Sequence, residues 1–272
     1  WDAITGRTQP LTGRIARDGK DIAILLYTSG STGTPKGVMH SFERITKVAE
    51  NIAKDIKSRI GDIDDNRILS YLPLAHVFER AWVEAMSMVD GKTHVFFAES
   101  LDTFVADLNR ARPTTFISVP RLWLKFQQGV FAKMPPKKLN RLLSIPILSG
   151  IVKRKVLKNL GLDQALLAGS GSAPIPAELI SWYQRLGLNM IEGYAMSEDF
   201  AYSHNSTPEI NAPGCVGVPL PGVEVRISEE GEILIKSPGQ LVGYYKRPDL
   251  DAEVFTADGF FRTGDIGIMD ER

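Results

Sequence analysis

The sequence predicts an α/β protein in which a mostly parallel sheet with covering helices is followed by a smaller β-rich subdomain. Short apolar runs of strand length alternate with longer amphipathic segments as far as residue 192. This alternation is typical of parallel strands joined by helical crossovers. Beyond residue 213, glycine and proline recur at close intervals, and two short strand patterns flank a Glu-Glu-Gly turn. We therefore expect an α/β region at 1–213 and the β-rich subdomain at 214–272.

The predicted strands are short runs of mainly aliphatic and β-branched residues, at 22–26, 68–72, 93–97, 115–119, 165–168, 188–192, 223–227 and 232–236. The predicted helices are longer segments of helical composition or spacing, at 41–60, 101–110, 121–131 and 176–186. The first helix has the clearest pattern, because Val48, Ile52 and Ile56 share one face. Pro176 suits the first position of the last helix. Residues 1–20 are polar and predict a loop.

The segment 132–163 has the weakest pattern in the chain. It is basic and apolar, and two adjacent prolines interrupt it at 135–136. We interpret it as a helical excursion on the solvated surface. A patch that contacts a membrane surface is the alternative interpretation.

Composition excludes several classes of function. Lys plus Arg and Asp plus Glu both total 32, so no net charge favours nucleic acid as a partner. No apolar run approaches the length of about 20 residues that spans a bilayer. The single cysteine, Cys215, excludes an internal disulfide and fits a reducing compartment. We expect a cytoplasmic protein with small-molecule partners. Peripheral contact with the inner membrane face and the oligomeric state stay open.

Residues 27–37, with the sequence YTSGSTGTPKG, follow the first predicted strand and precede the first helix. Their glycines allow a sharp turn that exposes successive N–H groups as a nest for anions. The hydroxyl groups and the Lys36 ammonium add donors suited to phosphate. The pattern is not a Walker P-loop, because no Gly-Lys-Ser/Thr sequence closes it. A flexible linker is the alternative, but linkers do not usually follow a buried strand directly.

This loop resembles the phosphate loop of the adenylate-forming superfamily, which includes acyl-CoA synthetases, luciferases and peptide-synthetase adenylation domains. Four further blocks follow in the family's order: PLAHVFER at 73–80, GSGSAP at 169–174, EGYAMSE at 192–198 and GFFRTGDIG at 259–267. The form of 73–80 is similar to that of long-chain fatty acyl-CoA synthetases in particular. The resemblance implies that the chain is a fragment of the large domain of an acyl-CoA synthetase-like protein.

The resemblance also implies roles for individual residues. The catalytic residues would be Lys36, His76, Ser197 and Glu198, with Glu198 also the metal ligand. The nucleotide would contact Thr28, Ser29, Gly30, Ser31, Thr32, Gly33, Gly171, Ser172, Ala173, Pro174, Glu192, Gly193, Tyr194, Ala195 and Asp265. Taken alone, a histidine such as His76 is more often structural. Ala195 and Ser197 are departures, because relatives commonly carry Gly and Thr there.

The reaction implied is ATP-dependent activation of a long-chain fatty acid to an acyl-adenylate with release of pyrophosphate. Thioester formation with CoA would follow, and Mg²⁺ would neutralise the triphosphate. Adenylation of an aryl or amino acid is one alternative, and a non-catalytic ATP- or AMP-binding module is another. Family members continue with a hinge and a mobile domain that carries a catalytic lysine. Neither follows residue 272, so we expect the fragment to be impaired alone.

Overall fold

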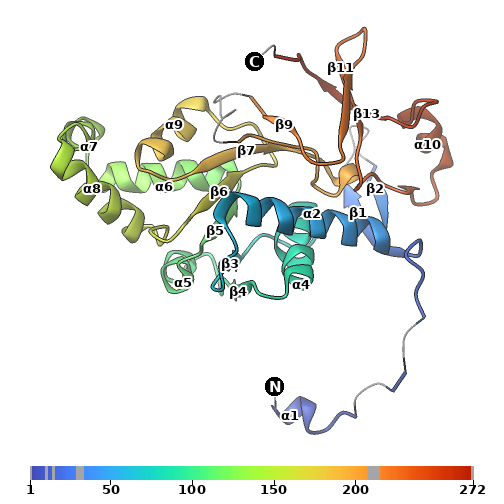
Figure 1. Ribbon diagram of the computed structural model, residues 1–272, viewed down its shortest axis with the longest axis horizontal. Coiled ribbons are helices and arrows are strands. Elements are labelled where there is room, and N and C mark those ends of the chain that lie inside the picture. Colours follow the sequence, from blue (N-terminus) through green and yellow to red (C-terminus); the bar gives the residue numbers. More distant parts are fainter. Residues whose placement is uncertain (1, 10–11, 14–15, 29–33, 208–214, 271–272) are drawn as a thin grey trace.

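The computed structural model describes residues 2–9, 12–13, 16–28, 34–207 and 215–270 (Figure 1). Its helices are α1 (Asp2–Thr5), α2 (Phe42–Ile60), α3 (Val77–Glu79), α4 (Met86–Asp90), α5 (Phe104–Ala111), α6 (Pro120–Lys133), α7 (Pro136–Leu143), α8 (Pro146–Asn159), α9 (Ala177–Arg185) and α10 (Pro248–Val254). A π-helical turn, η1 (Arg80–Ala85), joins α3 to α4, and a 3₁₀ turn, η2 (Ser197–Asp199), follows β7. The strands are β1 (Ile22–Thr28), β2 (Lys36–Ser41), β3 (Arg67–Ser70), β4 (His94–Phe97), β5 (Thr115–Ser118), β6 (Leu167–Ser170), β7 (Met190–Tyr194), β8 (His204–Asn205), β9 (Val218–Pro219), β10 (Glu224–Ile227), β11 (Glu232–Lys236), β12 (Gly243–Tyr244) and β13 (Phe261–Ile266).

The largest sheet has the strand order β5-β6-β7-β8-β9. Its first three strands are parallel, and β8 and β9 extend it in antiparallel fashion. β3 and β4 form a separate parallel pair, whereas β1-β2-β12 and β10-β11-β13 are antiparallel sheets. The predicted α/β class is confirmed. The parallel pairing is confined to strands that lie between residues 67 and 194.

Each predicted helix and strand is present, with its ends displaced by a few residues. α2 buries Val48, Ile52 and Ile56, as their spacing predicts. The main correction concerns residues 36–41: we placed 36 and 37 in the loop at 27–37, began the helix at 41, and predicted no strand between them. Residues 36–41 form β2, which pairs with β1 on one side and with β12 on the other. The pairing with β1 is local, but the glycine- and hydroxyl-rich residues before β2 indicated a loop, and the pairing with the distant β12 has no local signal.

The weakly patterned segment 132–163 is helical, as expected, and forms α7 and α8. Both helices lie at the end of the molecule opposite α10 (Figure 1). Among the described helices, none combines the length and the apolar character needed to cross a bilayer.

An aromatic cluster beneath β5 and β6 fixes the carboxyl end of the parallel strands. Trp123 of α6 is fully buried, and its Nε1 donates a hydrogen bond to the carbonyl oxygen of Gly169 at 3.3 Å. Tyr183 of α9 donates its hydroxyl proton to the carbonyl oxygen of Trp123 at 2.6 Å. Large aromatic side chains contribute much of the apolar area in a core. The loop after β6 therefore begins from a rigid point.

The C-terminal part of the chain supplies strands to more than one sheet. β9 pairs with β8, and Tyr244 of β12 pairs with Val38 of β2. The β10-β11-β13 sheet stands apart from these pairings, above the main sheet in Figure 1. The division of the chain at residue 213 remains a prediction, because residues 208–214 lie outside the described part.

Candidate active site

The β1–β2 hairpin brings Thr28 opposite Lys36 at the end where residues 29–35 connect the two strands. Five predicted phosphate-binding residues that connect the two strands lie outside the described residues: Ser29, Gly30, Ser31, Thr32 and Gly33. Lys36 is half-buried, and its Nζ lies 5.5 Å from the centroid of the Tyr244 ring. An ammonium at this distance from an aromatic ring is attracted by the ring quadrupole. The Lys36 side chain is thereby oriented by a residue of β12, which is not part of the β1–β2 hairpin.

Glu198 is held by the same tyrosine. The Tyr244 hydroxyl donates a hydrogen bond to Oε1 of Glu198 at 2.8 Å. The backbone carbonyl oxygen of Glu198 accepts a second hydrogen bond from the Leu241 N–H at 2.6 Å. Burial raises the pKa of the Tyr244 hydroxyl well above its usual range, so this group stays a donor at neutral pH. One aromatic side chain thus contacts both the predicted phosphate-binding lysine and the predicted metal ligand.

Two buried groups support the η2 turn that carries Ser197 and Glu198. Burial lowers the pKa of His40 to about 4, so the ring is neutral at pH 7. Its Nε2 donates to the carbonyl oxygen of Ser197 at 2.7 Å. Asp199 accepts hydrogen bonds from the N–H groups of Met196 and Tyr202 on Oδ1, at 3.0 and 3.2 Å. These contacts fix the backbone of the turn.

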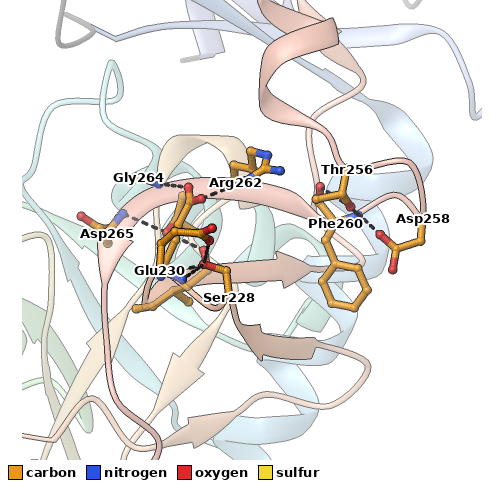
Figure 2. Close-up of polar contacts among 11 residues, drawn as sticks. Ser228, Glu230, Thr256, Asp258, Phe260, Arg262, Gly264 and Asp265 are labelled. Atoms are coloured by element: carbon orange, nitrogen blue, oxygen red, sulfur yellow. Dashed lines mark hydrogen bonds and ion pairs between the residues drawn. The ribbon is translucent and has the colours of Figure 1, made fainter.

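Tyr194 and Asp265 meet across the site from different parts of the chain. The Tyr194 hydroxyl donates to Oδ2 of Asp265 at 2.7 Å, and burial raises the pKa of this hydroxyl. Figure 2 shows how β13 is secured beside Asp265: the Gly264 N–H donates to Oε1 of Glu232 at 3.0 Å, and Arg262 forms an ion pair with the same carboxylate. The exposed Asp265 carboxylate is therefore carried on a well-fixed strand.

The loop after β6 and the end of β7 line a cavity of about 60 Å³. Gly171, Ser172, Gly193, Tyr194 and Ala195 are part of its wall. A Cβ on Gly193 would lie 2.5 Å from Oδ1 of Asn205, so a larger residue here would require the Asn205 side chain to shift. Ser172 has a φ of 68°, in the left-handed region that non-glycine residues rarely adopt. Such a strained residue is frequently found at a functional site.

The rest of the cavity wall is mainly apolar and comes from α3, η1 and the parallel strands. It includes Val77, Phe78, Trp82, Ile117 and Leu167. The polar part of the wall includes His204 and Asn205 of β8. Burial lowers the pKa of His204 to about 4, so it presents a neutral imidazole at pH 7. A volume of about 60 Å³ holds only a few water molecules. The enclosed space alone therefore does not accommodate a long acyl chain.

Four predicted residues lie apart from these contacts. Ala173 and Pro174 are exposed and do not line the cavity. Glu192 is buried, accepts a hydrogen bond from the Ile175 N–H at 3.4 Å, and has its pKa raised by burial. His76 is exposed at the start of α3, and its ring makes no hydrogen bond with any described residue. The structure brings none of these four into contact with Lys36 or Glu198.

The donor set at Glu198 fits a magnesium ion that is shared with a phosphate ligand. Across the described residues, no three His, Cys, Asp or Glu side chains are grouped so as to hold a metal alone. Mg²⁺ is commonly bound by only one or two carboxylates, with water and substrate phosphates completing its octahedral shell. Oε1 of Glu198 is already oriented by Tyr244, so a single carboxylate is available in a fixed position.

Sequence reasoning missed three supporting residues. Tyr244 stands in a stretch, GYYKRPD at 243–249, that we interpreted as structural. His40 and His204 carried no motif at all. His40 reaches Ser197 across 157 positions of the chain, and His204 reaches the cavity because β8 pairs with the end of β7. The only available signal was for Tyr244, whose block GYYKRPD at 243–249 stands among the family-like motifs.

Comparison with known families decides the classification. The model of a family described as AMP-binding enzyme matches residues 6–245. The chain belongs to this AMP-binding enzyme family. The match includes the β1–β2 hairpin, the loop after β6, η2 and Tyr244, so it extends over most of the site described above.

Similar proteins within this family have different activities in their names. The chain is 31% identical to long chain acyl-CoA synthetase 3 of Arabidopsis thaliana over 91% of its own length and 42% of that protein's. It is 34% identical to carboxylic acid reductase of Mycobacterium tuberculosis over 96% of its length and 23% of that protein's. Its fold matches ATP-bound MatB of Rhodopseudomonas palustris with a TM-score of 0.75 and 25% identity, over 99% of this chain and 50% of that one. The chain thus spans half or less of the length of these proteins.

Proposed function

We propose that this chain forms the nucleotide-binding part of an enzyme that activates a long-chain fatty acid with ATP. The products of the first step are the acyl-adenylate and pyrophosphate, and CoA then accepts the acyl group as a thioester. The observation that carries the proposal is the double contact of Tyr244, which holds Glu198 by a hydrogen bond and Lys36 by its ring. Membership of the AMP-binding enzyme family supports the same conclusion.

The proposed roles follow from the chemistry of each group. The Lys36 ammonium neutralises charge on the phosphates of ATP, and Thr28 with the hydroxyl-rich residues 29–33 donates hydrogen bonds to them. Glu198 holds Mg²⁺, which supplies further positive charge to the triphosphate when bound. Asp265 accepts hydrogen bonds from the ribose hydroxyls, and the Tyr194 ring lies against the base.

The remaining proposed residues shape the space around the reacting atoms. Ser197 donates a hydrogen bond to a phosphate, and His76 faces the carboxylate of the acid. The loop at 171–174, together with Glu192, Gly193 and Ala195, lets the adenine and the acyl carbonyl approach the backbone closely.

The proposed chemical step joins two anions. A carboxylate oxygen attacks the α-phosphorus of ATP, the bond from that phosphorus to the bridging oxygen breaks, and pyrophosphate leaves with the bonding electrons. In the second step the sulfur of CoA attacks the acyl carbonyl carbon, loses its proton, and displaces AMP. The protein has little covalent chemistry to do, so it acts through charge neutralisation and positioning.

The preference for a long-chain fatty acid rests on two observations. The residues around His76 have the form PLAHVFER, and the side chains that follow it, Val77 and Phe78, belong to the apolar wall of the cavity. The named activity of the Arabidopsis relative points the same way. Adenylation of another carboxylic acid is the second candidate, and similarity to a carboxylic acid reductase favours it. A non-catalytic ATP- or AMP-binding module is the third. We propose a cytoplasmic location for the protein.

The test is ATP–pyrophosphate exchange, measured on this chain extended to the full length of its relatives, with long and medium fatty acids, benzoate and amino acids, together with equilibrium ATP binding. We expect exchange to be stimulated most by long fatty acids. Lys36→Ala and Glu198→Ala should each lower it by about a hundredfold, since each removes charge stabilisation of the transition state. Lys54→Ala and Glu178→Ala are matched controls, because both side chains are exposed on helices. Exchange only with benzoate or amino acids would select the second candidate. ATP binding without exchange for any acid would select the non-catalytic module.

A further inference from the structure

The charges of this neutral chain are unevenly distributed. Residues 113–162 contain ten Lys and Arg residues and no Asp or Glu, although the two classes are equal in number over the whole chain. This stretch includes α6, α7 and α8. Within the described residues, none of its ten basic side chains forms an ion pair. No described carboxylate therefore pairs with this positive charge.

α8 also exposes large aliphatic side chains. Ile147 and Ile151 are 83% and 62% exposed, and Leu148 is 39% exposed. Isolated exposed aliphatic residues are common on protein surfaces, but a contiguous group marks a contact site. The opposite side of the helix is occupied, because Val156 is buried in the core. The exposed aliphatic residues thus form a group on the free side of the helix.

The aliphatic and basic groups lie on one face of α8. At 100° per residue, Ile147 and Ile151 share a face with residues 154, 155 and 158, and Arg154, Lys155 and Lys158 are exposed there. The face is apolar over its first two turns and basic over its last two. Lys137, Lys138 and Arg141 on α7 add further exposed positive charge beside it. This pair of helices lies at one end of the molecule, opposite α10 (Figure 1).

We propose that the exposed face of α8, with the basic side chains of α7, docks on the surface of an anionic lipid membrane. Basic side chains are attracted to the negative surface potential of such a membrane, each strengthening binding by about fivefold. The isoleucines would enter the boundary between headgroups and acyl chains, as the apolar face of an interfacial helix does. The contact is peripheral and does not depend on the reaction proposed above.

Other partners fit the surface less well. Nucleic acid is bound through its phosphates by basic residues and has no use for exposed isoleucines on the same face. A second copy of the chain would bring like charges together. The basic half of the α8 face needs a negatively charged partner, and the apolar half needs an accessible apolar layer. An anionic lipid membrane provides both.

The experiment measures co-sedimentation of the chain with vesicles of phosphatidylcholine alone and of phosphatidylcholine mixed with phosphatidylserine. We expect binding to the mixed vesicles only, weakened by added salt. Ile147→Ser with Ile151→Ser, and Arg154→Gln with Lys155→Gln and Lys158→Gln, should each weaken it at least tenfold. Matched controls are Leu101→Ser, at a residue 92% exposed elsewhere, and Lys47→Gln with Lys54→Gln on α2, and both should bind as the unchanged chain does.

Each other outcome would overturn the proposal. Equal binding to neutral vesicles would show that the basic residues are not used, and absence of binding to both would show that no lipid site exists. If the charge variant lost binding and the isoleucine variant kept it, the surface would be a site for polyanions in general. Adding duplex DNA to the vesicle assay identifies that case directly, since the DNA would then compete with the vesicles for the chain. Thermal unfolding of each variant shows whether the fold is retained, and the substituted residues are all exposed.

Discussion

Tyr244 donates its hydroxyl proton to Oε1 of Glu198 at 2.8 Å, although the two residues are 46 positions apart in the chain. The bond orients the one carboxylate that fits a metal at this site. It also couples the position of Glu198 to Lys36, whose ammonium lies over the same ring. A tyrosine interpreted from sequence as structural therefore stands between the two most important charges of the candidate site.

The first prediction concerns this hydroxyl. Tyr244→Phe removes the donor and keeps the ring over which Lys36 lies. A hydrogen bond to a charged group contributes about 1.5–3 kcal/mol, so ATP–pyrophosphate exchange should fall by about tenfold or more, with ATP affinity changed less. Tyr245→Phe is the matched control, because that neighbouring side chain is largely exposed. Equal exchange rates for the two variants would contradict a positioning role for Tyr244.

The second prediction concerns Asp265. Asp265→Asn should weaken binding of AMP by about tenfold, because a charged acceptor for the ribose hydroxyls is lost. The variant should bind 2′,3′-dideoxy-AMP as the unchanged protein does, since that ligand lacks both hydroxyls. Asp258→Asn is the control: this aspartate is also exposed, and it forms an ion pair with Arg226 of β10 and accepts a hydrogen bond from the Thr256 hydroxyl (Figure 2). Equal losses for AMP and the dideoxy ligand would exclude the ribose contact.

The third prediction uses the close packing of Gly193. Gly193→Ala would place a Cβ 2.5 Å from Oδ1 of Asn205, so we expect a loss of about 1–3 kcal/mol in the free energy of unfolding. Asn205→Ala should recover part of that loss in the double variant, which a double-mutant cycle measures by thermal or urea unfolding. Gly171→Ala is the control, because its Cβ would meet Phe78 at an ordinary 3.5 Å. Strictly additive effects would show that the contact with Asn205 is not the cause.

The fourth prediction is a pH dependence of stability. Burial raises the pKa of Asp199 to about 7, from an ordinary value of 3.8. Above about pH 4 the unfolded state loses a proton that the folded state keeps until about pH 7. The contribution of Asp199 to stability is therefore present at low pH and is lost as the pH rises to about 7. The loss amounts to as much as about 4 kcal/mol.

Asp199→Asn should remove this dependence and leave the backbone contacts of the turn in place, because an amide oxygen still accepts from Met196 and Tyr202. The measurement is urea unfolding of both proteins between pH 4 and 8, compared as a difference. The difference cancels His40 and His204, whose pKa values are lowered by burial and whose stabilising contributions are lost as the pH falls from about 6.5 to about 4. A difference that does not change with pH would contradict the prediction.

The sequence predicted most of the fold because its helices and parallel strands have strong local patterns. α2 is an example: Val48, Ala49, Ile52 and Ile56 repeat at helical spacing, and all four are buried. β12 could not be predicted, because it has two residues and pairs with β2, about two hundred positions away. β2 pairs with the neighbouring β1, but the glycine- and hydroxyl-rich pattern before it indicated a loop. The same limit applies to the site. Motifs predicted Lys36, Glu198 and Asp265, but the contacts of His40 and Tyr244 follow from tertiary pairing alone.

The contacts that orient the candidate site join residues very far apart in sequence. His40 reaches Ser197 over 157 positions, Tyr194 reaches Asp265 over 71, and Tyr244 reaches Glu198 over 46. Contacts between remote residues form late, because long loops must close before the contacts can repay the entropy lost. A partly folded chain therefore has its motifs but no assembled site. A nucleotide that binds here binds only the finished fold, so it would draw the folding equilibrium towards completion by mass action.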